Sequence, residues 1–251
     1  MQCFAISDFH LSSSGEKPMD RFGSHWFRHW ERLEKSWRES ITEDDLVLLP
    51  GDHSWALKLE EAVPDLEFIA SLPGHKVLIR GNHDYWWQSL SKVRKRFPSL
   101  HFLQNDAIRL GPAAICGTRG WDLPGKDGFG DPQDQTIYLR ELERFKLGLA
   151  ALDPEAPCRI AMLHYPPLFS YRKSSAFTQL MEEHHIDICV FGHLHRSAGI
   201  SKESEGGRGQ APLQGLVGGI RYYLVSCDMV DFRPVFIPWE VEATLCNPDA
   251  S

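Results

Sequence analysis

The chain has 251 residues, of which 42% are hydrophobic and 24% charged, and its net charge is −7 at pH 7. This composition is ordinary for a soluble globular protein with a substantial buried core. The acidic charge argues against broad contact with nucleic-acid phosphates, so we expect no duplex nucleic acid as partner. No apolar run approaches the roughly 20 residues of a membrane span, and residues 1–11 lack the basic leader of a signal peptide. We therefore expect a cytoplasmic protein without a membrane partner.

Short apolar runs alternate with helical patterns along the chain, which is typical of β-α-β construction. Runs bounded by Gly, Asp or His predict buried strands, because they are too short for helices. These runs are residues 3–6, 46–49, 76–79, 160–163 and 186–191. Further strands are predicted at residues 107–110, 113–116, 222–226 and 234–237. Together they indicate one or two mixed sheets in a single domain that spans residues 1–251.

Four segments between these strands predict helices. Two of them carry an apolar face at helical spacing, which indicates core packing rather than a cofactor site. These faces comprise Trp26, Trp30, Leu33, Trp37 and Ile41 in the first and Tyr138, Leu142, Phe145, Leu149 and Leu152 in the second. The other two helices span residues 57–72, where Pro64 is expected to restart the helix, and residues 87–97. The Gly-rich, polar segments 120–133 and 197–219 predict loops.

The six cysteines are scattered and form no CxxC pair. Five of them lie in or beside apolar segments, where a free thiol behaves as a small hydrophobic group. We therefore predict buried, reduced thiols rather than disulfides. These five are Cys3, Cys116, Cys158, Cys189 and Cys227.

Side chains that can bind a metal follow five of the predicted strands. They are Asp8 and His10, then Asp52, then Asn82 and His83, then His164, and finally His193 and His195. Because the carboxyl ends of strands in open α/β sheets converge on one crevice, we prefer a shared site over five unrelated polar turns. Carboxylate, amide and imidazole ligands without thiolate suit Mn, Fe or Zn.

The number of candidate ligands indicates two divalent ions, since seven ligands exceed one tetrahedral site and one carboxylate can bridge. Two carboxylates leave part of the charge of two such ions uncompensated, and this positive field attracts an anion such as phosphate. The ions can also acidify a shared water into a hydroxide nucleophile.

The same residues resemble the motifs of the calcineurin-like metallophosphoesterase family, which are DxH, GD, GNH with Asp or Glu, a single His, and GHxH. The motifs occur in this order as Asp8-Phe9-His10, Gly51-Asp52, Gly81-Asn82-His83-Asp84, His164 and Gly192-His193-Leu194-His195. The resemblance implies an α/β fold in which two mixed β-sheets, flanked by helices, form a four-layer αββα sandwich.

The resemblance also implies a role for each residue. One metal would be held by Asp8, His10 and His195 and the other by Asn82, His164 and His193, with Asp52 bridging. A metal-bridging hydroxide would attack phosphorus. His83 would contact the scissile phosphate or protonate the leaving group, and Asp84 would orient it. A nearby carboxylate such as Asp84 favours the cationic form of His83 that can supply a proton.

Several residues near the motifs have two interpretations. His53 is expected beside the site without binding a metal. Arg119 either binds substrate phosphate through its guanidinium group or forms a salt bridge that stabilises its loop. Four aromatic residues either stack on an aromatic leaving group or pack beneath the loops; they are Trp55, Tyr85, Trp86 and Trp87.

These features favour a metal-dependent phosphoesterase acting on a small phosphodiester or phosphomonoester. By resemblance, Asp84 in place of Glu favours the phosphodiesterase branches over the protein phosphatases. Two other classes stay open: a non-catalytic interaction module on the same fold, and a metal-dependent hydrolase of a non-phosphate bond. The presence of all seven ligands and of the His83-Asp84 pair favours an enzyme.

Overall fold

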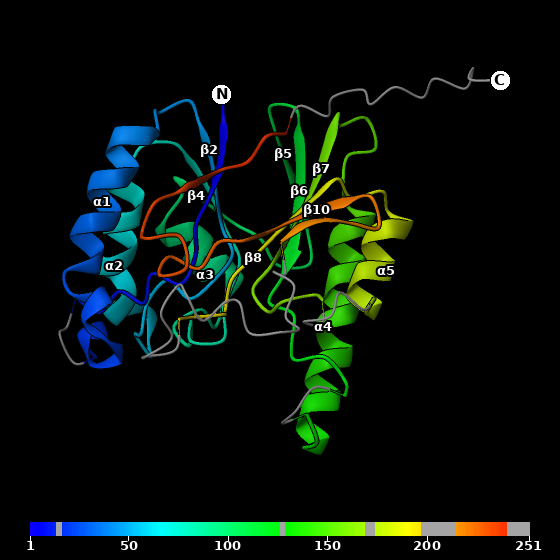
Figure 1. The fold of residues 1–251 in the computed structure, drawn as a ribbon, viewed down its shortest axis with the longest axis horizontal. Coiled ribbons are helices and arrows are strands. Elements are labelled where there is room, and N and C mark those ends of the chain that lie inside the picture. The colour runs from blue at the N-terminus through cyan, green and yellow to red at the C-terminus, as the bar shows by residue number, and fades with distance from the viewer. Residues whose placement is uncertain (14–16, 126–128, 169–173, 197–213, 240–251) are drawn as a thin grey trace.

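The computed structural model describes residues 1–13, 17–125, 129–168, 174–196 and 214–239. Two mixed β-sheets pack face to face, and helices cover the outer face of each sheet (Figure 1). Helices α1 (His29–Ser40), α2 (Leu59–Ser71) and α3 (Leu90–Arg96) cover one sheet, whereas α4 (Pro132–Ala150) and α5 (Ala176–Glu183) cover the other. The predicted αββα sandwich is confirmed.

The first sheet has five strands in the order β11-β1-β2-β3-β4. Four of them run parallel: β1 (Cys3–Ala5), β2 (Leu46–Leu49), β3 (His75–Leu78) and β4 (Leu100–Phe102). Strand β11 (Val235–Phe236) pairs antiparallel with β1 at the edge.

The second sheet has six strands in the order β5-β6-β7-β8-β10-β9. Its central strands run parallel: β6 (Ala113–Thr118), β7 (Cys158–Leu163), β8 (Ile188–Phe191) and β10 (Ile220–Leu224). Strands β5 (Ala107–Leu110) and β9 (Gly215–Val217) pair antiparallel at the two edges.

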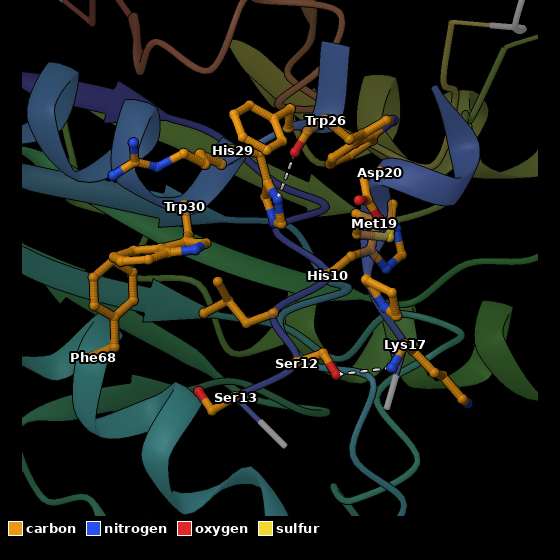
Figure 2. A pocket seen from close by; sticks show the side chains of 14 residues that line it. His10, Ser12, Ser13, Lys17, Met19, Asp20, Trp26, His29, Trp30 and Phe68 are labelled. Atoms are coloured by element: carbon orange, nitrogen blue, oxygen red, sulfur yellow. Dashed lines mark hydrogen bonds between the residues drawn. The ribbon is translucent and has the colours of Figure 1, made fainter. Parts of the chain in front are cut away.

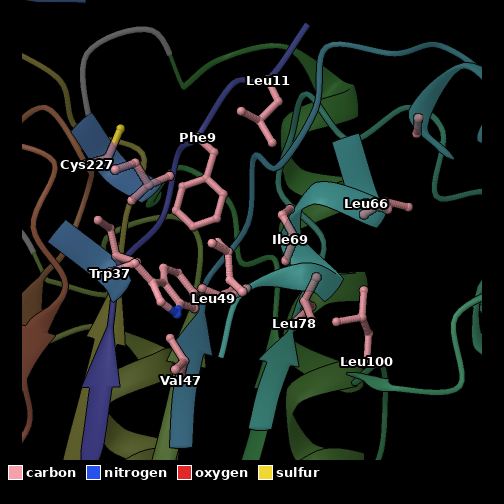
Figure 3. Close-up of a cluster of buried hydrophobic side chains, with 14 of the residues drawn as sticks. Phe9, Leu11, Trp37, Val47, Leu49, Leu66, Ile69, Leu78, Leu100 and Cys227 are labelled. Atoms are coloured by element: carbon pink, nitrogen blue, oxygen red, sulfur yellow. The ribbon is translucent and has the colours of Figure 1, made fainter. Parts of the chain in front are cut away.

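Each sheet is buried on both faces, and successive side chains of a strand alternate between these two faces. In β2, Leu46 and Leu48 point into the layer between the sheets, whereas Val47 and Leu49 point toward the helices. Figure 3 shows these last two beside Trp37 of α1. Because successive side chains point to opposite faces, a strand buried on both sides reads as an unbroken apolar run.

The carboxyl ends of the two sheets meet at one point of the sandwich. Ser7, after β1, pairs in parallel with Ser226, after β10. The Ser7 backbone N–H donates to Val225 O at 2.9 Å, and Cys227 N–H donates to Ser7 O at 2.9 Å. These bonds place the ends of β1 and β10 side by side, so residues that follow strands of both sheets share one crevice.

Several predicted elements differ from the structure in position or extent. Pro64 lies inside a continuous α2, so the expected restart is wrong; the apolar face of Leu66 and Ile69 continues to pack on the sheet. The predicted loop 120–133 ends earlier, because Pro132 begins α4. Within the predicted loop 197–219, residues 215–217 form β9, and residues 197–213 lie outside the described ranges.

Other differences concern short elements and side-chain burial. Strand β4 and helix α5 were not predicted, because three and eight residues are too few for a clear periodic pattern. The first apolar face is only partly correct: Trp26 precedes α1, and Trp30 is 45% exposed.

The five cysteines predicted to be buried thiols are buried and free. The sixth, Cys246, lies outside the described ranges. None of the helices in the described part of the chain is long and apolar enough to cross a bilayer.

Candidate metal centre

The structure brings the seven predicted metal ligands together at the meeting point of the two sheets. Asp8, His10, Asp52 and His164 are buried, while Asn82, His193 and His195 are partly open to solvent. Within the described ranges, two groups of side chains could hold a metal ion, with their ligand atoms within 4.8 Å of one another. The first group is Asp8, His10 and His195, and the second is Asp8, Asp52 and His164.

The first group is centred on two imidazoles that face each other. His10 Nε2 lies 3.3 Å from His195 Nε2. It also lies 3.7 Å from Oδ2 of Asp52, which belongs to the second group. His195 Nε2 lies 3.6 Å from Asp8 Oδ1. All these atoms are Lewis bases, which is the arrangement that a divalent cation requires.

On the other side of Asp52, an amide oxygen meets two further imidazoles. Asn82 Oδ1 lies 2.6 Å from His164 Nε2 and 3.1 Å from His193 Nδ1. His164 Nε2 also lies 3.4 Å from Asp52 Oδ2. This carboxylate oxygen therefore approaches one imidazole from each expected ligand set. Asp8 is the member common to both groups described above.

The backbone at this site is strained. Four of the seven residues adopt a left-handed conformation that is unusual outside glycine: Asp8 (φ 60°), His10 (φ 48°), Asp52 (φ 55°) and His193 (φ 72°). Such strain costs on the order of 1–3 kcal/mol per residue and clusters at functional sites, where the surrounding structure fixes it. Here it turns side chains that follow the strands into the common crevice.

Motif glycines allow the turns to approach one another closely. A Cβ atom on Gly81 would collide with the side chain and backbone nitrogen of Asp52, and one on Gly192 would collide with the side chains of Asp8 and Ser7. Gly81 itself has no left-handed conformation. Its lack of a side chain therefore serves close packing against the expected bridging residue rather than backbone flexibility.

Burial and charge shift the pKa values of the site in opposite directions. Burial lowers the pKa of His10 well below its usual value. Burial also opposes protonation of His164, but the adjacent Asp52 carboxylate outweighs it and raises the pKa to about 9. Burial raises the pKa of Asp8. Buried carboxylates at such a site need nearby positive charge, which an imidazolium or a bound cation can provide.

The donor set fits a divalent metal. It combines carboxylate, amide and imidazole groups without thiolate, and Nε2 of His10 lies among these groups. Such a set suits Mn, Fe or Zn.

One carboxylate at the site was not predicted. Asp228 follows β10 and is buried, and its Oδ1 accepts a hydrogen bond from His195 Nδ1 at 2.9 Å. Its Oδ2 accepts from Arg196 N–H at 2.8 Å. With Nδ1 of His195 occupied in this way, Nε2 faces Asp8 with its lone pair available to a metal. Extending the strand-end rule to the predicted strand 222–226 would have pointed to Asp228.

The His83 ring lies at the edge of the site. It packs on Trp55 with ring centroids 4.3 Å apart, and its backbone N–H donates to Asp52 Oδ1 at 2.8 Å. Among the described residues, neither ring nitrogen of His83 has a hydrogen-bond partner. Burial lowers the pKa of His83 below its usual value. The Asp52 and Asp84 carboxylates favour the cation, as expected for Asp84, but do not outweigh burial.

Asp84 organises the backbone around His83 rather than contacting its ring. It is buried, and its carboxylate accepts hydrogen bonds from the backbone N–H groups of Asp52 (2.9 Å), His53 (2.8 Å) and Gly81 (2.8 Å) and from the Trp86 indole (2.9 Å). These bonds join the turn after β2 to the turn after β3. They fix the position of His83 indirectly, through Asp52.

The contacts of Arg119 match the salt-bridge interpretation, and its Nε atom is buried without a hydrogen-bond partner among the described residues. Its guanidinium group pairs with the buried Glu141 (Nη2 to Oε1, 3.5 Å) and lies 4.6 Å from the Trp121 ring centroid. His53 is fully buried beneath the site, where its Nε2 is 3.0 Å from Ile79 O.

The four aromatic residues divide between core and site. Trp86 and Trp87 are buried in the core between the first sheet and its helices. Tyr85 is 48% exposed. Trp55 stacks on His10 with ring centroids 4.7 Å apart and an interplanar angle of 23°, so it forms part of the site wall.

The chain is similar to solved structures in its fold and matches one protein family in its sequence. The phosphopantetheinyl hydrolase of Mycobacterium tuberculosis is 17% identical with a TM-score of 0.54, and the alignment covers 90% of this chain and 88% of that one. A protein of unknown function from Aquifex aeolicus is 13% identical with a TM-score of 0.47, and the alignment covers 94% and 95%. No curated protein matches the chain. The calcineurin-like phosphoesterase family matches residues 1–197, and the chain belongs to this family.

Proposed function

We propose that this protein is a dinuclear metal-dependent phosphoesterase that hydrolyses a small phosphodiester or phosphomonoester, with phosphodiesters preferred. The observation that carries the proposal is the convergence of all seven candidate ligands, from both sheets, on one crevice. Membership of the calcineurin-like phosphoesterase family supports the same class of reaction.

The two expected ligand sets would hold Mn, Fe or Zn. Asp8, His10 and His195 form one set, Asn82, His164 and His193 form the other, and Asp52 would bridge them because its Oδ2 lies within 3.7 Å of His10 Nε2 and 3.4 Å of His164 Nε2. When bound, such ions supply an activated water nucleophile and neutralise charge on phosphoryl oxygens.

Within this site the protein itself would position the substrate and handle its charge. The ring of His83 has no hydrogen-bond partner among the described residues and lies beside Asp52, so it is available to donate a hydrogen bond to a phosphoryl oxygen or a proton to the leaving oxygen. Trp55 limits the movement of His83 on one side. Asp84 would act as a positioning residue, since it fixes the turns that carry Asp52 and His83.

Two observations favour an enzyme over a non-catalytic module on the same fold. No ligand of either set is replaced, and His83 is half-buried beside the ligands rather than packed away in the core. The preference for phosphodiesterase over protein phosphatase rests on Asp84 alone.

The proposal is tested by metal analysis of protein purified without chelator, followed by hydrolysis assays. Bis(p-nitrophenyl) phosphate and p-nitrophenyl phosphate are compared in the presence of added Mn. We expect about two metal ions per chain and faster hydrolysis of the diester. Absence of bound metal together with no hydrolysis would refute the enzyme, and faster hydrolysis of the monoester would reverse the diester preference.

A further inference from the structure

A cavity of about 550 Å³ lies beside the candidate metal centre. It is bounded by the segment after β1, by the turn before α1, and by the facing surfaces of α1 and α2. Figure 2 shows Trp30 and Phe68 on one side of this cavity and His10 and Met19 on the other. Its volume is typical of sites that bind small organic ligands.

The cavity and the metal centre share a wall. His10 lines the cavity and also belongs to the first group of candidate ligands. Trp26 lines the cavity too, and its ring centroid lies 6.2 Å from that of His10 and 5.7 Å from that of His195. The cavity and the metal centre are therefore adjacent, with the buried His10 and Trp26 side chains (each 2% exposed) between them.

Six of the 14 residues that line the cavity carry large apolar side chains: Leu11, Met19, Trp26, Phe27, Trp30 and Phe68. Phe27 is 63% exposed and Trp30 is 45% exposed, although both are large hydrophobic residues. The apolar face predicted for α1 is thus wider than the part that the core covers. Exposed apolar surface gathered in one place marks a binding site rather than random surface composition.

Three polar residues around the cavity are engaged in hydrogen bonds or ion pairs, whereas Ser12, Lys17 and Asp20 also line it. Ser13 Oγ donates to Asp65, and the two ring nitrogens of His29 lie 3.2 Å from Trp26 O and 2.9 Å from Phe9 O. Arg28 pairs with Glu31. These groups are poorly placed to recognise a sugar or a nucleobase, which require several free donors and acceptors.

A positive charge lies where the cavity meets the metal centre. Lys17 lines the cavity, and its Nζ lies 5.0 Å from the ring centroid of Trp55. Trp55 in turn contacts both His10 and His83. Although the Asp20 carboxylate also lines the cavity and the chain has a net charge of −7, this local cation complements an anionic phosphate attached to an apolar group.

We infer that the cavity binds a hydrophobic organic group of the substrate, and that the substrate class is a phosphoester carrying a sizeable hydrocarbon or aryl group. This inference rests on the proposed function, because it places the phosphate of the same molecule at the metal centre. The apolar group contributes binding energy through the burial of its surface against Trp30, Phe68 and their neighbours.

The test uses methyl, butyl and octyl p-nitrophenyl phosphate as substrates of the Mn-loaded protein. The leaving group is constant in this series, so only the apolar group changes. Burial of one methylene is worth up to about fourfold in binding, and we expect kcat/KM to rise at least about tenfold from methyl to butyl. Trp30→Ala and Phe68→Ala should each lower the octyl-to-methyl ratio of kcat/KM several-fold.

Leu147→Ala serves as the control, because Leu147 is also a large exposed apolar residue (57%) but lies on α4, which covers the other sheet. Its octyl-to-methyl ratio should equal that of the unmodified protein. Hydrolysis of all three esters at equal kcat/KM would overturn the inference and leave the phosphoesterase standing.

A binding measurement separates the inference from the proposed function. Octyl phosphate and methyl phosphate are titrated calorimetrically into the same protein. We expect octyl phosphate to bind at least about tenfold more tightly, and Trp30→Ala to reduce this difference. If no ester is hydrolysed, the proposed function fails, and equal affinities for the two phosphates would then overturn the inference as well.

Discussion

The contact between Asp228 and His195 yields a sharp prediction about metal affinity. Asp228→Asn keeps the size of the side chain but removes its charge and one of its two acceptor oxygens. In the structure those oxygens accept from His195 Nδ1 at 2.9 Å and from Arg196 N–H at 2.8 Å. The asparagine oxygen can replace only one of these bonds, and its amide group would face the other donor.

The expected loss is large enough to measure. Carboxylates that orient a metal-binding histidine are worth about 10- to 100-fold in metal affinity, which corresponds to about 1.4–2.7 kcal/mol. We expect this loss for the ion held by Asp8, His10 and His195, and a smaller effect on the other ion. Competition titration with a fluorescent chelator measures both affinities, and thermal unfolding of the metal-free protein checks that the fold is intact.

Asp231→Asn is the matched control. Asp231 also pairs with Arg196 (Oδ1 to Nη2, 3.1 Å), and its side chain is 52% exposed. The same substitution there should leave both metal affinities within about twofold of the original protein. If the two variants bind metal equally well, Asp228 does not position His195 for a metal, and the reasoning is wrong.

Three further predictions concern the site and the core. His83→Ala should retain both metals but lower kcat by about two to four powers of ten; an unchanged kcat would remove His83 from the reaction. Asp52→Asn should weaken both ions and His195→Ala chiefly one, which metal titration resolves; equal losses in the two variants would contradict a bridging Asp52. Burial raises the pKa of Cys158 to about 12, and all five described thiols are buried. In the Cys246→Ser variant, fewer than about one thiol per folded chain should therefore react with Ellman's reagent at pH 8, whereas all five should react after unfolding. Rapid reaction in the folded protein would show that these thiols are not protected.

The strand ends could be read from the amino-acid sequence for a simple physical reason. Strands buried on both faces are unbroken apolar runs, so a change to Asp, Asn or His marks where each strand leaves the core. Asp8, Asp52 and His164 stand at such changes. The strand ends could therefore be predicted without knowing any distance, whereas the four-layer sandwich was implied by the resemblance of the motifs to the calcineurin-like family.

Features that depend on contacts distant in the chain could not be predicted in this way. Asp228 contacts His195 only because β10 pairs with β8, and nothing in the local sequence specifies that neighbour. Helical spacing placed Trp30 on the apolar face of its helix. Whether this side chain packs in the core or lines a cavity depends on where α2 packs.

Asp84 illustrates the same limit within a motif. The resemblance implied that Asp84 orients His83. Its carboxylate accepts hydrogen bonds from the backbone N–H groups of Asp52 and His53, in the turn after β2, which lie 32 and 31 residues earlier in the chain. Local patterns determine which segments form strands and which residues follow them. Which of those residues come into contact is determined by the order and packing of the strands, because that packing alone sets the distances between them.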